Sequence, residues 1–391
     1  VAVGQATLDA NTTGANNTGL GRAALSANTT ADNNTAVGSN ALAANTTGVS
    51  NTAVGYQALD TNTTGRYNTS IGIGSLTANT DGEFNVGLGG YALSSNTTAD
   101  NNTAAGYSAL GTNSTGANNT AVGYYALQLN TTGSDNAAVG KQAMPANTTG
   151  ESNTAVGSTA LTVNTTGSFN TVMGRSALGL NTTGNHNVAI GRNALAANIT
   201  SSNNVAVGQS SLTACLGAYN TGIGDSAGDG ITTGTHNVCV GYNSGSQTNN
   251  LTTGAQNVLV GNYTHTSAAD STYQVVLGYN VVGAADDSFT FGRQAIDTTC
   301  SMGGTTWSAP SDIRLKEDIQ DEEVGLDFIN ELRPVTFLWK KEKDIPLDMK
   351  AYKEGSEERT MNGKYNHGFV AQEVKEVIDK HDLKEGFDMW Q

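Results

Sequence analysis

Residues 34–50 read NTAVGSNALAANTTGVS, and residues 51–67 repeat the pattern as NTAVGYQALDTNTTGRY. Each copy of this repeat carries an apolar residue followed by glycine, such as Val37 before Gly38. We call these apolar residues anchors. Their spacing is 17 from the first to the thirteenth, and then 16, 17, 20, 17 and 14. The 18 anchors are Val3, Leu20, Val37, Val54, Ile71, Leu88, Ala105, Val122, Val139, Val156, Met173, Ile190, Val207, Ile223, Val240, Val260, Leu277 and Phe291.

Other positions keep the same period. Leucine stands five positions after most anchors, as Leu42 does, and asparagine stands eight after, where Asn45 opens an Asn-Thr-Thr-Gly turn. This period is too short for a helical hairpin repeat, and glycine, asparagine and threonine disfavour helix. The pattern therefore predicts one turn of a parallel β-solenoid per repeat, with two short strands and two turns. Stacked asparagines would bond to one another between rungs, and 18 rungs would make a rod of roughly 85 Å.

Each repeat offers little apolar bulk for a core. Val37 and Leu42, with alanines such as Ala41, cannot fill a wide solenoid. A single chain would bury little area against an ordering cost of about 1–2 kcal/mol per residue. We therefore expect a homotrimer or similar assembly in which several chains share a central core. A monomeric flat roll is the alternative.

Two units carry a resemblance to a known family. Asn-Thr-Ala-Val-Gly-Tyr-Gln-Ala-Leu (51–59) and Asn-Val-Ala-Ile-Gly-Arg-Asn-Ala-Leu (187–195) resemble the head repeats of trimeric autotransporter adhesins, over roughly residues 1–260. The Asn-Thr-Thr-Gly segment makes the repeat longer here. The resemblance implies a trimeric, left-handed parallel β-roll.

Charge divides the chain in two. Residues 1–310 hold 6 Lys+Arg and 14 Asp+Glu, whereas residues 311–391 hold 13 and 20. This shift predicts a rod over 1–261, a β-rich cap or neck over 262–310, where aromatics gather, and a separate domain over 311–391.

The net charge of −15 argues against a nucleic-acid partner. Membrane insertion is not expected, because the sequence lacks an apolar run of about 20 residues.

The stretch 311–391 carries three motifs in order. They are Ser-Asp-Ile-Arg-Leu-Lys (311–316), Leu-Arg-Pro-Val-Thr-Phe-Leu-Trp (332–339) and Gly-Phe-Val-Ala-Gln-Glu-Val (368–374). Apolar spacing predicts a helix over 324–332 that ends at Pro334, then a strand, and later a strand from His367 leading into a helix through Lys380. This is a small α+β domain.

These motifs resemble the self-cleaving intramolecular chaperone of phage endosialidases, tail spikes and tail fibres. In that family the domain helps three chains find register and then releases itself through a serine–lysine dyad. The motif places the dyad on Ser311 and Lys316, so the cut falls between Pro310 and Ser311. Serine needs a base to take its proton, and lysine serves only when neutral. The plainer alternative is that Ser311 caps a helix. Family domains usually continue into a long trimeric helix, and the sequence up to Gln391 leaves open whether that helix is present.

The resemblances imply a phage tail fibre for host attachment, made in the bacterial cytoplasm and exposed on the virion. Expected partners are a host cell-surface receptor or glycan and other tail proteins. The alternatives are a tail spike that hydrolyses glycans and a bacterial trimeric surface adhesin. Hydrolysis needs paired carboxylates, and only Asp286-Asp287 and Asp81-Gly82-Glu83 bring acids close in sequence. Beyond autoproteolysis we expect no enzymatic activity and no cofactor.

Metal binding is not expected either. The three cysteines form no CxxC pattern, so we expect them to be small buried side chains. We expect His186 and His236 to be exposed turn residues. The rod aromatics look scattered in sequence rather than present in every repeat.

Overall fold

The computed structural model describes residues 1–246, 251–294, 296–302, 326–347, 352–359 and 363–381. The chain divides into two compact units, Val1–Pro310 and Ser311–Gln391. None of the helices within the described ranges has the length and apolar character needed to cross a membrane.

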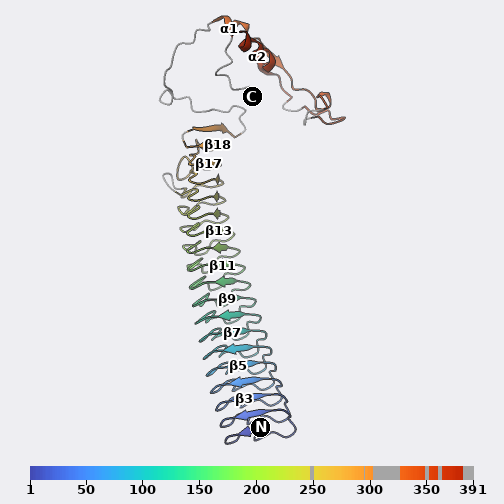
Figure 1. Ribbon diagram of the computed structural model, residues 1–391, viewed down its shortest axis with the longest axis vertical. Helices are drawn as coiled ribbons and strands as arrows, with labels where there is room; N and C mark the ends of the chain where they lie inside the picture. The colour runs from blue at the N-terminus through green and yellow to red at the C-terminus, as the bar shows by residue number, and fades with distance from the viewer. Residues whose placement is uncertain (247–250, 295, 303–325, 348–351, 360–362, 382–391) are drawn as a thin grey trace. The chain divides into compact units, whose positions relative to one another are not determined.

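The first unit is a stack of short parallel strands (Figure 1). Each strand pairs with the next at the offset of the repeat, so that Thr35 lies opposite Thr52. This confirms the predicted parallel β-solenoid. The strands are β1 (Ala2–Val3), β2 (Thr18–Leu20), β3 (Thr35–Val37), β4 (Thr52–Val54), β5 (Thr69–Ile71), β6 (Val86–Leu88), β7 (Thr103–Ala105), β8 (Thr120–Val122), β9 (Ala137–Val139), β10 (Thr154–Val156), β11 (Thr171–Met173), β12 (Val188–Ile190), β13 (Val205–Val207), β14 (Thr221–Ile223), β15 (Val238–Val240), β16 (Val258–Val260), β17 (Val275–Tyr279) and β18 (Ser288–Arg293).

Each regular repeat contributes one short strand, not the two that the sequence pattern predicts. The rest of the rung is turn, because three of its non-glycine residues take positive φ: Asn40 at 60°, Leu42 at 49° and Ser50 at 58°. Such residues interrupt an extended run. The turns nevertheless bond rung to rung, as where the Leu42 N–H donates to the Ala58 carbonyl at 3.0 Å. Stacked turns therefore replace the second strand.

The glycine after each anchor forms a corner that no other residue fits. Gly174 has a φ of +138°, and a Cβ there would lie 2.5 Å from the carbonyl oxygen of Gly191 in the next rung. Both the backbone conformation and the close approach require glycine. The repeated Val-Gly or Ile-Gly pair is thus a geometric necessity of stacking.

One chain fills the inside of its own rung. Ala36, Ala41 and Leu42 are completely buried. The anchor Val37 lies on the opposite side of the strand and is only half-buried, because neighbouring strand residues point to opposite faces. The rung is therefore narrow, and any core shared between chains would have to use the anchors.

Two ladders of buried asparagine run through the rod, which confirms the predicted bonding between rungs. Asn45 Nδ2 donates to Asn28 Oδ1 at 3.1 Å and to the Gly48 carbonyl at 2.9 Å. In the second ladder the Asn51 N–H donates to Asn34 Oδ1, and Asn34 Nδ2 also donates to Gly48 at 2.9 Å. Both ladders thus donate hydrogen bonds to the carbonyl of Gly48, which closes the turn.

The first ladder stops where a cysteine interrupts it. Cys215 stands one repeat after Asn198, in the place of the next ladder asparagine. The buried Asn198 Oδ1 consequently has no hydrogen-bond partner. Cys215, Cys239 and Cys300 are all buried, and none of them forms a disulfide in the described structure, as the sequence predicts.

Longer strands end the stack. β17 and β18 continue the parallel pairing, and β19 (Ile296–Ser301) then pairs antiparallel with β18. The described part of the expected cap, up to residue 302, is β-structured and continuous with the rod.

The second unit combines helices with a two-stranded antiparallel sheet. Its elements are α1 (Leu326–Glu331), β20 (Pro334–Phe337), the 3₁₀ helix η2 (Glu342–Asp344), β21 (Asn366–Phe369) and α2 (Ala371–Lys380). The order matches the predicted helix, strand, strand and helix. Its apolar residues are poorly covered, since Leu326 is 76% and Ile329 is 59% exposed. The side of α1 that carries Leu326 and Ile329 is therefore uncovered in the single chain, whereas Phe328 is half-buried and packs against His381.

Candidate functional site

The residues predicted to cut the chain lie outside the part that the structure describes. Pro310, Ser311 and Lys316 lie within 303–325, outside the described residues. The serine–lysine dyad and the helix-cap alternative therefore both stay predictions.

The structure does bring the other two C-terminal motifs together. β20 comes from the motif at 332–339 and β21 leads into the motif at 368–374, and they pair with Pro334 opposite Phe369. Thr336 and His367 lie directly opposite, with Thr336 Oγ1 3.0 Å from His367 Nδ1. This hydroxyl–imidazole pair is exposed on the sheet, so it reads as a cross-strand contact rather than an activated nucleophile.

An arginine–carboxylate pair ties the strand to the helix. Arg333 donates from Nε to Glu373 Oε2 at 3.0 Å and from Nη2 to Oε1 at 2.5 Å. The hydrogen bond from Arg333 lowers the pKa of the Glu373 carboxyl, and the same bond raises the pKa of Arg333. Both residues belong to the motifs, but they lie far apart in the sequence, which hides the contact from sequence reasoning. Arg333 therefore orients α2 against β20.

A charged cleft lies beside this pair. It measures about 330 Å³ and is lined by Glu331, Arg333, Glu373, Glu376, Val377 and Lys380. Lys380 Nζ donates to Glu331 Oε1 at 2.7 Å, and this bond is the main cause of a lowered Glu331 pKa. His381 Nε2 lies 3.3 Å from the same carboxylate. The lining offers paired charges and no nucleophile. Its ion pairs therefore hold α1 and α2 together.

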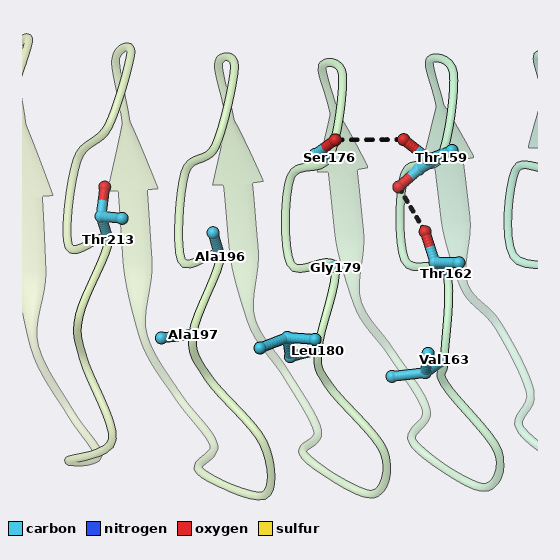
Figure 2. A pocket seen from close by; sticks show the side chains of 9 residues that line it. All are labelled: Thr159, Thr162, Val163, Ser176, Gly179, Leu180, Ala196, Ala197 and Thr213. Carbon is cyan, nitrogen blue, oxygen red and sulfur yellow. Dashed lines mark hydrogen bonds between the residues drawn. The ribbon is translucent and has the colours of Figure 1, made fainter.

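The rod carries a surface groove that the sequence did not reveal. It measures about 510 Å³ and crosses four rungs (Figure 2). Thr159 Oγ1 lies 3.1 Å from Ser176 Oγ, and Thr162 Oγ1 donates to the Thr159 carbonyl at 2.6 Å. Figure 2 labels the lining, which is Thr159, Thr162, Val163, Ser176, Gly179, Leu180, Ala196, Ala197 and Thr213. Small residues hollow the surface, while hydroxyls and two larger apolar side chains surround the hollow.

Three of the four acids considered for glycan hydrolysis, Asp81, Glu83 and Asp286, are held by local bonds. Asp286 Oδ1 accepts the Thr272 N–H at 2.9 Å, which lowers its pKa. A hydrogen bond from Thr64 lowers the pKa of Asp81, and Glu83 is paired with Arg66 at 2.7 Å. The lowered pKa values keep Asp286 and Asp81 ionised, so these two carboxyls are poor proton donors to a glycosidic oxygen. Within the described residues, no three His, Cys, Asp or Glu side chains gather as metal ligands would.

The rod aromatics form short stacks between rungs. Phe169 and His186 stack with ring centroids 4.9 Å apart, and Tyr219 and His236 at 4.8 Å. Both histidines are exposed turn residues, as predicted. The aromatics are not present in every rung, as the sequence indicates, but those that stand one repeat apart in sequence become neighbours in space.

Comparison with known proteins identifies one part of the chain. Residues 311–383 match the family model described as chaperone of endosialidase. No curated protein and no solved structure matches the chain. The family model covers less than a fifth of the 391 residues, so it characterises the second unit only. The chain thus carries a domain similar to the chaperone of endosialidase, C-terminal to a β-solenoid rod.

Proposed function

We propose that the protein is a homotrimeric tail fibre of a phage, used for host attachment, and that its C-terminal unit aligns three chains before self-cleavage. The observation that carries the proposal is the match of residues 311–383 to the endosialidase chaperone, directly after a β-solenoid. As a fibre it would be made in the bacterial cytoplasm, join other tail proteins and meet a receptor or glycan on the host.

A strictly periodic rod needs such a device. When two chains slide past each other by one repeat, nearly every side chain meets an equivalent neighbour, because the columns repeat. Whole-rung errors then cost little energy, and register is weakly specified. A non-repeating domain at one end fixes the starting register for the whole rod.

The outer face of the strands supports an assembly of several chains. The anchors follow one another along the sheet, and many are well exposed in the single chain, with Leu20 at 47%, Ile71 at 44% and Met173 at 44%. A continuous apolar stripe of this kind is a typical interaction surface. In a closed homotrimer the three stripes would cover one another. The exposed Leu326 and Ile329 of α1 offer a second apolar surface.

Self-cleavage would make the assembly hard to reverse. The Ser311 hydroxyl would attack the Pro310 carbonyl carbon while neutral Lys316 takes the hydroxyl proton. The Lys316 ammonium would then return the proton to the Ser311 nitrogen as the Pro310–Ser311 C–N bond breaks, leaving the Ser311 amine. Water would hydrolyse the resulting ester between Pro310 and the Ser311 oxygen. The rod would end at Pro310. Loss of the aligning unit leaves a trimer that cannot easily find register again, so it becomes kinetically stable.

Sedimentation and mass measured on the same sample test the proposal. We expect a sedimentation mass of three rods, and denatured fragments that end at Pro310 and begin at Ser311. Ser311→Ala and Lys316→Ala should each leave an uncut chain that still forms trimers, with Ser308→Ala as the matched control that is cut normally. A folded monomer would refute the assembly, and cutting of the Ser311→Ala chain at that bond would refute the dyad.

A further inference from the structure

The cations of the rod lie along one edge. Residues 1–310 contain six Lys and Arg, and five of them stand at the second position after an anchor. These five are Arg22, Lys141, Arg175, Arg192 and Arg293. The sixth, Arg66, lies elsewhere in the repeat and pairs with Glu83 at 2.7 Å. We call the second position after the anchor, together with the position that follows it, the corner stripe.

Tyrosine shares this stripe. Eight of the eleven tyrosines in residues 1–310 occupy one of its two positions. Tyr107 stacks on Tyr124 with ring centroids 5.9 Å apart, and it also contacts Tyr91 and Tyr125. Tyr242, Tyr263 and Tyr279 form a second cluster farther along. The stripe therefore presents aromatic faces at both ends of its central cationic part.

The cations of the stripe form no ion pair with any other described residue. All five are exposed. Arg175 and Arg192 stand on adjacent rungs, which are held together where the Asn193 N–H donates to the Arg175 carbonyl at 3.1 Å. Rungs are about 4.8 Å apart, and like charges on neighbouring strands destabilise a sheet. An external anion would relieve this repulsion.

The groove of Figure 2 borders the same part of the stripe. Ser176, which lines it, directly follows Arg175, and Thr159 lies one rung away. Gly179, Ala196 and Ala197 leave the space open. A ligand held by the arginines would therefore find hydroxyl groups and a shallow apolar floor beside it.

We propose that the corner stripe binds a linear acidic polysaccharide laid along the rod, an inference that rests on the proposed attachment function and names its ligand class. Carboxylate or sulfate groups would pair with Arg175, Arg192 and Lys141. Tyrosine rings would pack against the apolar faces of the sugars. Groove hydroxyls would bond to sugar hydroxyls.

Charge density favours a polysaccharide over nucleic acid. Duplex DNA carries one charge per about 1.7 Å of its axis and is held by many closely spaced cations. The stripe offers only five cations along almost the whole rod, on a unit that also carries 14 acids. A polymer with one acidic group per sugar or per few sugars suits this spacing better.

The test measures binding of the intact chain to four polymers at low salt: polygalacturonate, dextran sulfate, neutral dextran and duplex DNA. We expect binding to polygalacturonate or dextran sulfate, which separates carboxylate from sulfate recognition, and none to dextran. The double variant Arg175→Gln/Arg192→Gln should weaken it at least about tenfold. The matched control is Arg66→Gln, which removes a cation outside the stripe and should leave affinity unchanged.

Three results would overturn the inference: no acidic polysaccharide binds, dextran binds equally well, or Arg66→Gln weakens binding as much as the double variant. Tighter binding to duplex DNA would assign the stripe to nucleic acid instead. Sedimentation of the same samples keeps the two proposals apart. A trimer that binds no acidic polymer contradicts the ligand alone, whereas a monomer contradicts the fibre.

Discussion

In the rod, a side chain finds its partner one repeat away, whereas in the C-terminal unit the partners come from distant parts of the sequence. Asn62 bonds to Asn45 at a sequence separation of 17, but Arg333 reaches Glu373 and Lys380 reaches Glu331 at separations of 40 and 49. The rod bonds are buried and identical from rung to rung. Those of the second unit are exposed, and each is different.

This difference separates two tasks that one design cannot perform. Identical buried contacts add up along a quasi-one-dimensional stack, so they give the rod strength in proportion to its length. Because they are identical, these contacts do not determine which rung of one chain lies against which rung of another. The described part of the C-terminal unit has little buried apolar surface, with Ile378 the only buried residue of α2, but its pairs are specific. If this unit aligns the chains as we propose, strength and register are encoded separately.

The largest expected effect comes from adding one methyl group at a rod corner. Gly174→Ala places a Cβ 2.5 Å from the Gly191 carbonyl oxygen, at a φ of +138°. Strain and overlap together should cost about 4 kcal/mol in the free energy of unfolding, measured with urea. Gly179→Ala in the same rung is the control, because other repeats carry alanine there, as Ala196 does. Equal effects of the two changes would mean that corner geometry does not limit stacking.

Breaking a ladder should rank second. Asn113 Nδ2 donates to Asn96 Oδ1 at 3.0 Å and to Gly116 O at 2.8 Å, and Asn113 Oδ1 accepts from Asn130 at 2.8 Å. Asn113→Ala leaves buried polar atoms without partners and should cost about 3 kcal/mol. Thr115→Ala, in the exposed part of the same turn, should cost less than about 0.5 kcal/mol. A small loss for Asn113→Ala would show that water replaces the ladder.

Sequence periodicity was enough to predict the parallel solenoid and the asparagine ladders, because a residue such as Asn45 recurs where only stacking can satisfy it. Periodicity did not predict that each rung holds only one strand, because nothing in the sequence marks Leu42 as a residue with positive φ. It also missed the groove, which depends on Gly179 and Ala197 meeting across rungs. The Arg333–Glu373 pair needed the fold of the second unit. The dyad on Ser311 and Lys316 rests on the motif alone and stays a prediction, because both residues lie outside the described part of the chain.

Alkaline pH should weaken the rod through its buried thiols. Burial raises the pKa of Cys215 from 9.0 to about 11 and that of Cys239 to about 12. Above pH ~9 the unfolded chain releases these protons while the folded chain keeps them, so stability falls as pH rises from 9 to 11. Between pH 8 and about 9.7 the wild type should lose about 2 kcal/mol more than the double variant Cys215→Ala/Cys239→Ala, which is about 1 kcal/mol per thiol. Parallel pH profiles would contradict this origin.

Restoring the interrupted ladder should stabilise the rod modestly. In Cys215→Asn, the new Nδ2 can donate to the unpartnered Asn198 Oδ1. One satisfied buried acceptor is worth about 1 kcal/mol in the free energy of unfolding. Cys215→Ser, whose hydroxyl is too short to span the rung, is the control and should give no gain. If both variants destabilise equally, the rung has closed around the thiol too tightly to admit an amide.

The smallest effect is expected in the C-terminal unit, at the pair of Arg333 and Glu373. The side chains are 65% and 39% exposed, so water and salt screen their attraction. A double-mutant cycle with Arg333→Gln and Glu373→Gln should give a coupling energy below about 1 kcal/mol, falling further as salt is added. Lys375 and Asp379, 3.1 Å apart within α2, provide a local pair for comparison. Because Arg333 and Glu373 join two motifs, replacing them should clearly lower the yield of correctly aligned trimers, while the free energy of unfolding changes only slightly. A coupling as large as the effect of Asn113→Ala would mean that this unit, too, relies on buried polar contacts, and the contrast with the rod would disappear.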